Sequence, residues 1–214
     1  MCTHDQGGID SLKRTIQHYS DQAQHYFSLY NSVDAENVHG DWHAFLHTTT
    51  PGTALDVGAG SGRDANWLAN KGWHVVAAEP ADKLRTLAEK NAHRNVTWCN
   101  ASLPDLTTLP ASPSAYDLIL LSAVWMHLPE NLRPTALAQL TQLLCKNGRI
   151  VISLRFGPSD DARPMHPVSV EELQTLAADN GLVARNLNPV PSEDGLNRDD
   201  VKWVTVELMR EEEK

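Results

Sequence analysis

Three glycines alternate in a short turn in the first third of the chain: Gly58, Gly60 and Gly62. An apolar run that contains Asp56 precedes them, and a second apolar run that ends at Glu79 follows a helical segment. Glycine allows positive φ angles and lets a ligand approach without meeting a Cβ atom. The start of the following helix favours a carboxylate or phosphate, and an acid placed like Glu79 accepts hydrogen bonds from ribose hydroxyls. The pattern therefore predicts a site for an adenosine-containing ligand.

The spacing of the third glycine separates the known kinds of nucleotide turn. A dinucleotide fingerprint, G-x-G-x-x-G, would need glycine where Arg63 stands. A P-loop would need lysine followed by serine or threonine, and this turn has no lysine. An ordinary tight turn between a strand and a helix would explain one glycine, but not three with an acid in each flanking strand.

A second group of reactive side chains follows the strand expected over residues 116–122. His127 is the best candidate for a general base, because an unperturbed imidazole titrates near neutrality. Packing or a backbone hydrogen bond at the start of a helix would explain it equally well. Trp125 and Met126, directly before it, are expected to shape a substrate pocket.

Arg155 follows the next strand, expected over residues 149–154, and opens a long loop that ends at His166. A guanidinium group binds a carboxylate or phosphate through two parallel hydrogen bonds, so Arg155 is a candidate for holding a substrate. The alternative is an ion pair with one of the many acids of the chain. His166 is a further candidate for the substrate pocket, with weaker indications for Arg163, Arg198 and Trp203.

The N-terminal region carries apolar residues at three- and four-residue spacing from Ile9 to Tyr19, which predicts an amphipathic helix. We expect Tyr19 and Tyr26 to close over the ligand as a lid. Packing of both rings in the hydrophobic core is the alternative and is at least as well supported.

Three histidines, His39, His43 and His47, fall four residues apart around a second helix expected over residues 41–47. This spacing could place three imidazoles on one helical face, as in a metal site. No cysteine or carboxylate follows at a spacing that would complete such a site, so the pattern favours a structural role and predicts no metal.

The elements that must position these residues alternate along the chain. Apolar runs predict strands at residues 53–57, 75–78, 96–99, 116–122 and 149–154, and helical patterns fall at 63–71, 81–91 and 134–145. A helix over 169–180, with Ser169 and Glu172 as a capping box, then leads to two extended runs at 182–191 and 201–209. We expect an α/β fold: a doubly wound, mostly parallel sheet with a C-terminal antiparallel hairpin and an N-terminal helical cap.

The G-x-G-x-G turn with Asp56 before it and the reversed hairpin at the far end resembles the class I S-adenosylmethionine-dependent methyltransferases, over residues 53–209. The resemblance implies a seven-stranded sheet, S-adenosylmethionine as cofactor and S-adenosylhomocysteine as product. It implies that the glycine turn holds the methionine part, that the acid of the second strand binds both ribose hydroxyls, and that the following loops complete the site. By position, these cofactor-binding residues are Asp56, Gly58, Ala59, Gly60, Gly62, Glu79, Pro80, Asn100, Ala101, Ser102, Ser122 and Ala123, with Val124 beside them.

Composition limits the function further. The 214 residues carry a formal net charge of −9, which gives no electrostatic reason to bind nucleic acid or an anionic membrane. The three cysteines are widely separated, which predicts free thiols, and no apolar run resembles a signal peptide or a membrane span. We therefore expect a cytoplasmic monomer or homodimer with one domain, in which residues 1–50 form a cap on a core at residues 51–210.

The leading hypothesis is an enzyme that methylates an O, N or S atom of a small molecule. It is supported by the negative charge and by the sequence Ser122 to Trp125 after the fourth strand, where methyltransferases of exposed bases carry a motif like Asn-Pro-Pro-Tyr. An RNA or protein methyltransferase is the first alternative. A regulatory subunit that binds S-adenosylmethionine without catalysis is the second.

Overall fold

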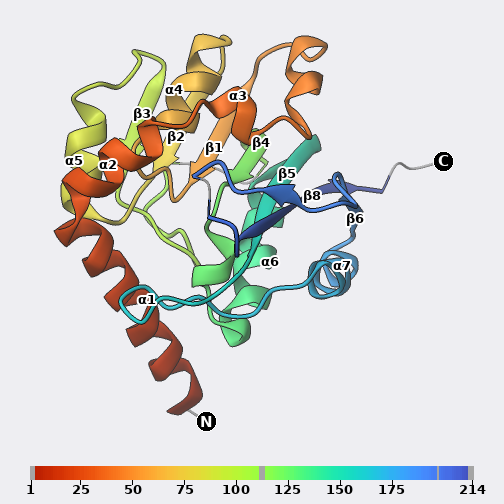
Figure 1. The fold of residues 1–214 in the computed structure, drawn as a ribbon. Helices are drawn as coiled ribbons and strands as arrows, with labels where there is room; N and C mark the ends of the chain where they lie inside the picture. The colour runs from red at the N-terminus through yellow and green to blue at the C-terminus, as the bar shows by residue number, and fades with distance from the viewer. Residues whose placement is uncertain (1–2, 111–113, 197, 212–214) are drawn as a thin grey trace.

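An eight-stranded sheet runs through the middle of the protein (Figure 1), seen in a computed structural model that describes residues 3–110, 114–196 and 198–211. The strand order is β3-β2-β1-β4-β5-β8-β6, and the short β7 pairs with β8. The strands are β1 (Thr53–Val57), β2 (His74–Ala78), β3 (Val96–Cys99), β4 (Tyr116–Leu121), β5 (Leu144–Phe156), β6 (Leu182–Asn186), β7 (Ser192–Glu193) and β8 (Lys202–Arg210).

Strands β1 to β5 are parallel, whereas β8 runs antiparallel to both β5 and β6. The expected doubly wound sheet with a C-terminal antiparallel hairpin is therefore confirmed. Two details differ from the expectation. The two-residue β7 adds an eighth strand. In addition, β5 begins at Leu144, five residues before the strand expected over residues 149–154, and its register shifts against β4.

Both faces of the sheet are covered, because successive residues of a strand point to opposite sides. Leu118 and Leu120 of β4 join a cluster with Leu68 of α4, while Ile119 of the same strand joins the cluster that contains Leu140 of α6. The helices of the sheet region are α4 (Arg63–Asn70), α5 (Asp82–Glu89), α6 (Arg133–Leu143) and α7 (Val170–Asp179), with two 3₁₀ turns, η2 (Trp125–His127) and η3 (Glu130–Leu132).

The N-terminal region folds into α1 (Thr3–Asp21), α2 (Ala23–Asn31), α3 (Ala35–Val38) and the 3₁₀ turn η1 (His43–His47). Tyr26 and Ala23 of α2 form a third apolar cluster with Leu84 of α5. Figure 1 shows α1 lying across one side of the molecule, next to the long segment that leaves β5 and returns to α7. The amphipathic helix predicted up to Tyr19 is present, whereas the α-helix predicted at residues 41–47 is wrong, because only a 3₁₀ turn forms there.

The predicted capping box at α7 forms in part. The Ser169 hydroxyl accepts a hydrogen bond from the backbone N–H of Glu172 at 3.0 Å, as expected of an N-cap. The Glu172 carboxylate does not return to the cap. It pairs instead with Arg133 at 2.6 Å, because that guanidinium is 1% exposed and needs a counter-charge.

Within the described ranges, Cys99 and Cys145 are free thiols, as expected, while Cys2 lies outside them. No helix in the described part of the chain is both long enough and apolar enough to span a bilayer.

Candidate active site

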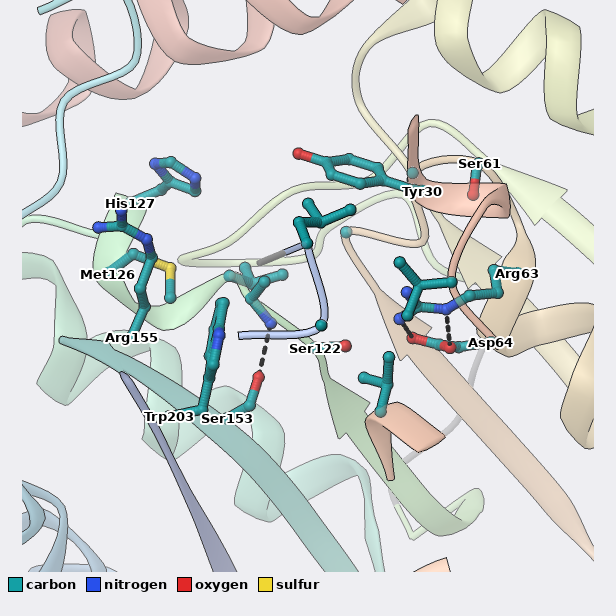
Figure 2. Close-up of a pocket in the computed structure, with 18 of the residues that line it drawn as sticks. Tyr30, Ser61, Arg63, Asp64, Ser122, Met126, His127, Ser153, Arg155 and Trp203 are labelled. Carbon is teal, nitrogen blue, oxygen red and sulfur yellow. Dashed lines mark hydrogen bonds and ion pairs between the residues drawn. The ribbon is translucent and has the colours of Figure 1, made fainter. Parts of the chain in front are cut away.

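A cavity of about 330 Å³ lies above the carboxyl ends of β1, β4 and β5, between the sheet and the N-terminal helices. The glycine turn after β1 forms one end of it, and Figure 2 shows Ser61, Arg63 and Asp64 on this side. His127, Met126 and Arg155 gather at the other end, with Tyr30 over the middle. Ligands of open α/β sheets bind at this edge, because the loops that follow the strands all meet there.

The glycine turn has the backbone geometry that its sequence predicts. Gly58, Gly60 and Gly62 have φ angles of +67°, +54° and +78°, in the left-handed region. A Cβ atom at Gly58 would lie 2.6 Å from Val124, and one at Gly62 would lie 2.8 Å from the ring of Trp98. At Gly60 the nearest atom is 3.7 Å away, on Tyr30. Gly60 therefore faces open space in the cavity, while its two neighbours are packed against the protein.

The Glu79 carboxylate reaches the same turn from the end of β2. Its two oxygens accept hydrogen bonds from the backbone N–H groups of Gly60, at 2.8 Å, and Ala81, at 2.7 Å. Burial raises the pKa of Glu79, and the two backbone donors partly offset this effect. The carboxylate lines the cavity, so it offers a ligand hydrogen-bond acceptors directly beside the glycine turn.

Asp56 lies beneath the turn and does not line the cavity. Its side chain is 1% exposed, and one carboxylate oxygen is buried without a hydrogen-bond partner. Burial raises the pKa of Asp56 well above its usual range, and the nearby Asp64 raises it further. The position fits a residue that shapes the turn from below.

Asp64 and Arg63, at the start of α4, form a bidentate pair with distances of 2.7 and 2.9 Å. His39 adds to this pair, because its Nε2 lies 3.0 Å from the Asp64 carboxylate and its Nδ1 accepts a hydrogen bond from Trp42. Despite complete burial, His39 and Arg63 hold the pKa of Asp64 far below its usual range. The acid is therefore ionised and its charge is already compensated within the protein.

His127 stands at the opposite end of the cavity in a continuous hydrogen-bond chain. Its Nδ1 lies 3.1 Å from the Pro164 carbonyl oxygen, which can only accept, so Nδ1 carries the proton and Nε2 accepts one from the Tyr19 hydroxyl at 3.1 Å. Tyr30 and Arg163 donate to the Tyr19 oxygen, at 3.3 and 3.1 Å. Burial lowers the pKa of His127 to about 4, so the ring is neutral at physiological pH.

Three arginines line the cavity near His127. Arg163 pairs with Asp160 at 3.1 Å, and Arg198 pairs with Asp194 at 2.7 Å. Although burial raises the pKa of Asp194, its contacts with Arg198 lower it to about 2. Arg155 has no carboxylate partner among the residues described. Of these three arginines, two are therefore neutralised by a carboxylate, and the positive charge of Arg155 is not.

Residues 55–152 match the protein family described as the methyltransferase domain. A solved structure of Burkholderia thailandensis 1,6-didemethyltoxoflavin-N1-methyltransferase, with bound 1,6-didemethyltoxoflavin and S-adenosylhomocysteine, superposes with a TM-score of 0.72 at 16% identity, over 96% of this chain and 91% of that one. Residues 55–152 are thus similar to a methyltransferase domain, and the chain has the fold of that solved structure.

Two further proteins are similar to this chain. A TehB-like S-adenosylmethionine-dependent methyltransferase from Corynebacterium glutamicum superposes with a TM-score of 0.64 at 21% identity, over 91% of this chain and 98% of that one. An uncharacterized methyltransferase of Bacillus mycoides is 27% identical over 111 residues, which are 52% of this chain and 50% of that protein. The match thus spans about half the length of this curated relative.

Most of the residues singled out in the sequence converge on the cavity. The turn residues Gly58, Ala59 and Gly60 line it, as do Glu79 and Pro80 after β2. The same is true of the residues predicted after β4 and β5 and on α1, which are Ser122, Ala123, Met126, His127, Arg155 and Tyr19. Arg163, Arg198 and Trp203 line it as well.

Other predicted residues lie around the cavity without lining it. Tyr26 bonds to His18 at 3.0 Å and packs behind Tyr19, and Trp125 is 0% exposed in the core. The His166 backbone N–H donates to the Met126 carbonyl at 2.7 Å, so His166 holds the loop after β5 against η2 and does not line the cavity. Gly62 and the segment Asn100, Ala101 and Ser102 also lie outside the lining.

Tyr30 and the pair Arg63 and Asp64 were not singled out in the sequence. Tyr30 is one helical turn after Tyr26 and so shares its face of α2, a signal that was present in the spacing. The charged pair follows the last glycine directly, where the first turn of a helix borders the predicted ligand site.

The three histidines do not form a row. His39 ends α3 and faces Asp64. His43 and His47 lie at the two ends of η1, with their ring centroids 5.9 Å apart. His43 also stacks on Trp67. In the part of the chain that is described, no group of three or more His, Cys, Asp or Glu side chains is arranged to hold a metal ion.

Proposed function

We propose that this protein transfers a methyl group from S-adenosylmethionine to an O, N or S atom of a small molecule. The observation that carries the proposal is a single cavity that joins the open face of Gly60 to the neutral imidazole of His127. The N-terminal helices contribute Tyr19 and Tyr30 to its wall. A site with this form can hold a cofactor and an acceptor side by side and keep water out.

The residues present fit S-adenosylmethionine at the end of the cavity formed by the glycine turn. Gly60 leaves the space that a ligand can fill, and the Glu79 carboxylate beside it accepts hydrogen bonds of the kind a ribose donates. Ser122 and Ala123 complete this part of the wall. When bound, S-adenosylmethionine supplies an electrophilic methyl group on a sulfonium. The chain's own part is to orient the acceptor and to remove its proton.

His127 is the group that can take this proton. Its Nδ1 donates to Pro164, so the lone pair on Nε2 accepts from the Tyr19 hydroxyl at the cavity wall. An acceptor hydroxyl, amine or thiol that reaches this place gives its proton to Nε2, either directly or through Tyr19. Tyr30 and Arg163 hold the Tyr19 oxygen in position for this exchange.

The size and charge of the site favour a small acceptor over RNA or protein. The cavity of about 330 Å³ must hold the cofactor as well as the acceptor, which leaves room only for a small acceptor group, and the net charge of −9 works against binding to a nucleic acid backbone. The Burkholderia relative was solved with bound 1,6-didemethyltoxoflavin, a small molecule, which agrees with this choice.

Two measurements test the proposal. Calorimetry with S-adenosylmethionine, S-adenosylhomocysteine and NAD should show binding of the first two and none of NAD. Transfer of a labelled methyl group into fractionated cell extract should then place the label in the metabolite fraction. Label in RNA or protein would replace the small-molecule proposal, and tight cofactor binding without transfer into any fraction would favour a regulatory subunit.

A further inference from the structure

Arg155 is the cationic group of the cavity whose charge the protein leaves uncompensated. It leaves β5 next to Trp203 of β8 and lines the cavity beside His127 and Met126 (Figure 2). Arg163 and Arg198, its cationic neighbours, each have a carboxylate of their own. In the described part of the chain no carboxylate pairs with Arg155.

The donors of Arg155 are used unequally. Its Nη1 donates to the Pro158 carbonyl at 2.8 Å and contacts the Met165 sulfur at 2.9 Å. Its Nε is buried and has no hydrogen-bond partner. A buried donor without a partner is unfavourable by about 1–3 kcal/mol, so native proteins rarely retain one without a ligand or water to satisfy it. The unused Nε edge of the guanidinium is the edge that binds an oxyanion with two parallel hydrogen bonds.

The surrounding charges favour an anion at this position. The pKa of Arg155 is lowered first by burial and then by the charges of Arg198 and Arg163, while the charges of Asp194 and Asp200 act in the opposite direction. His127 adds no charge, because it is neutral. An incoming anion therefore meets the guanidinium groups of three arginines, of which Arg163 and Arg198 are paired with Asp160 and Asp194.

The carboxylates of the cavity are not available to Arg155. Asp194 is held by Arg198 and Trp203, and Asp64 is held by Arg63 at the other end of the cavity. Glu193 pairs with Lys202, and Glu79 accepts from two backbone amides. Asp41 accepts from the hydroxyls of Ser192 and Thr205. Among the described residues, Arg155 therefore does not form the ion pair that was the alternative explanation for it.

We propose that the methyl acceptor is an anionic small molecule whose carboxylate or phosphate group binds the Nε edge of Arg155. This inference rests on the proposed function and adds the class of substrate. The anion lies at the end of the cavity away from the glycine turn, so the cofactor and the charged group of the acceptor occupy opposite ends. Met126, Tyr19 and Trp203 also line the cavity and suit the uncharged part of the acceptor.

The charge of the labelled product tests the inference without any variant. Label transferred by the wild-type protein into the metabolite fraction should be retained on an anion-exchange column at neutral pH. A carboxylate product should elute below about pH 3, where the group is protonated. A phosphate monoester should stay bound there and be released by alkaline phosphatase. A labelled product that is neutral or cationic at neutral pH would overturn the inference and leave the proposed function standing.

Titration of the protein saturated with S-adenosylhomocysteine tests the binding site directly. The probes are phenyl phosphate and benzoate, with benzyl alcohol as the uncharged counterpart. At least one anionic probe should bind, and R155Q should weaken it about tenfold or more while leaving S-adenosylhomocysteine affinity unchanged. R155K keeps the charge but loses the Nε edge, so its affinity for the anionic probe should fall between those of the wild type and R155Q. Arg185, exposed on β6, provides the control variant R185Q, which should bind like the wild type.

The outcomes separate the two proposals. Equal binding of the anionic probes by the wild type and R155Q, or preference for benzyl alcohol, would overturn the anionic acceptor. Absence of label from every small-molecule fraction would count against the proposed function, and the titration would then decide the anion site by itself. If Arg155 only supports the loop through Pro158, R155Q would lower the unfolding midpoint without changing probe affinity, which also refutes the inference.

Discussion

Replacement of Gly60 by alanine tests whether the cofactor lies on the glycine turn, because this glycine alone of the three faces open space. A Cβ atom at Gly60 meets nothing closer than 3.7 Å, so G60A brings no steric overlap with the protein. The φ angle of +54° makes alanine unfavourable by about 1–2 kcal/mol. The added methyl group points into the cavity, where it takes the place of a ligand.

G62A is the contrasting variant. Its φ angle of +78° carries the same backbone penalty, and its Cβ would lie 2.8 Å from the Trp98 ring, which must move. Overpacking of this kind adds about 1–3 kcal/mol, so the free energy of unfolding should fall by roughly 2–5 kcal/mol. In a chain of this length that corresponds to a lower unfolding midpoint by roughly 4–20 °C, against roughly 2–8 °C for G60A.

The backbone penalty alone is measured by G181A. Gly181 has a φ angle of +68° and follows α7, and a Cβ atom added there would have no other atom within 4 Å. Thermal unfolding of the three variants gives the stability differences, and calorimetry with S-adenosylhomocysteine gives the affinities. G60A should bind about tenfold or more weakly, while G62A and G181A bind within about threefold of the wild type. Wild-type affinity in G60A would refute the placement of the ligand on this turn.

Three other variants probe the rest of the site and its support. H127Q should lower kcat with little effect on S-adenosylhomocysteine affinity, and it should also remove a loss of stability that the wild type shows as pH falls. The pKa of His127 is about 4 in the folded protein and 6.5 in the unfolded protein. The contribution of the neutral ring to the free energy of unfolding is therefore fully present above pH 6.5, and about 3 kcal/mol of it is lost by pH 4. Urea unfolding at each pH measures this loss. Tyr19, Arg163, Arg155 and His166 face this ring and are unchanged in H127Q, so equal pH dependence in both proteins would contradict the assignment. E79A should weaken cofactor binding about tenfold by calorimetry, because the acceptor beside Gly60 is lost. R133A should lower the free energy of unfolding by about 3–5 kcal/mol, because it removes one partner of the buried pair with Glu172. R133M should lower it by less, because methionine fills much of the volume of the arginine side chain.

The succession of strands and helices along the chain, the glycine turn and the reversed hairpin could be predicted from local sequence. Apolar runs of strand length and helical spacing are properties of neighbouring residues, so they indicate elements without knowledge of the fold. The positive φ angles at Gly58, Gly60 and Gly62 follow from the same local information. The two-residue β7 and the 3₁₀ turn at His43–His47 were missed, because such short elements depend on the surfaces they pack against.

Partners of charged side chains were decided only by the tertiary structure. Glu172 has the spacing of a capping box, yet the buried Arg133 takes its carboxylate, since an unpaired buried charge is far more unfavourable than a lost cap. Asp56 and Glu79 look alike in sequence, as acids in neighbouring strands. Asp56 lies beneath the glycine turn and Glu79 lines the cavity, because the two acids occupy different positions along strands that pair in register.

The sequence by itself predicted the end of the cavity where we place the cofactor, because the glycines, the following helix and the acid of the second strand form one local unit of chain. The opposite end, where we place the acceptor, was decided by the fold. Tyr19, His127 and Arg163 come from segments up to 144 positions apart and meet in one hydrogen-bond chain only after α1 has packed against the loop that follows β5. Among the described residues, Arg155 remains without a carboxylate partner for the same reason: Asp194 is held by Arg198 and Asp160 by Arg163, which only the packed structure shows.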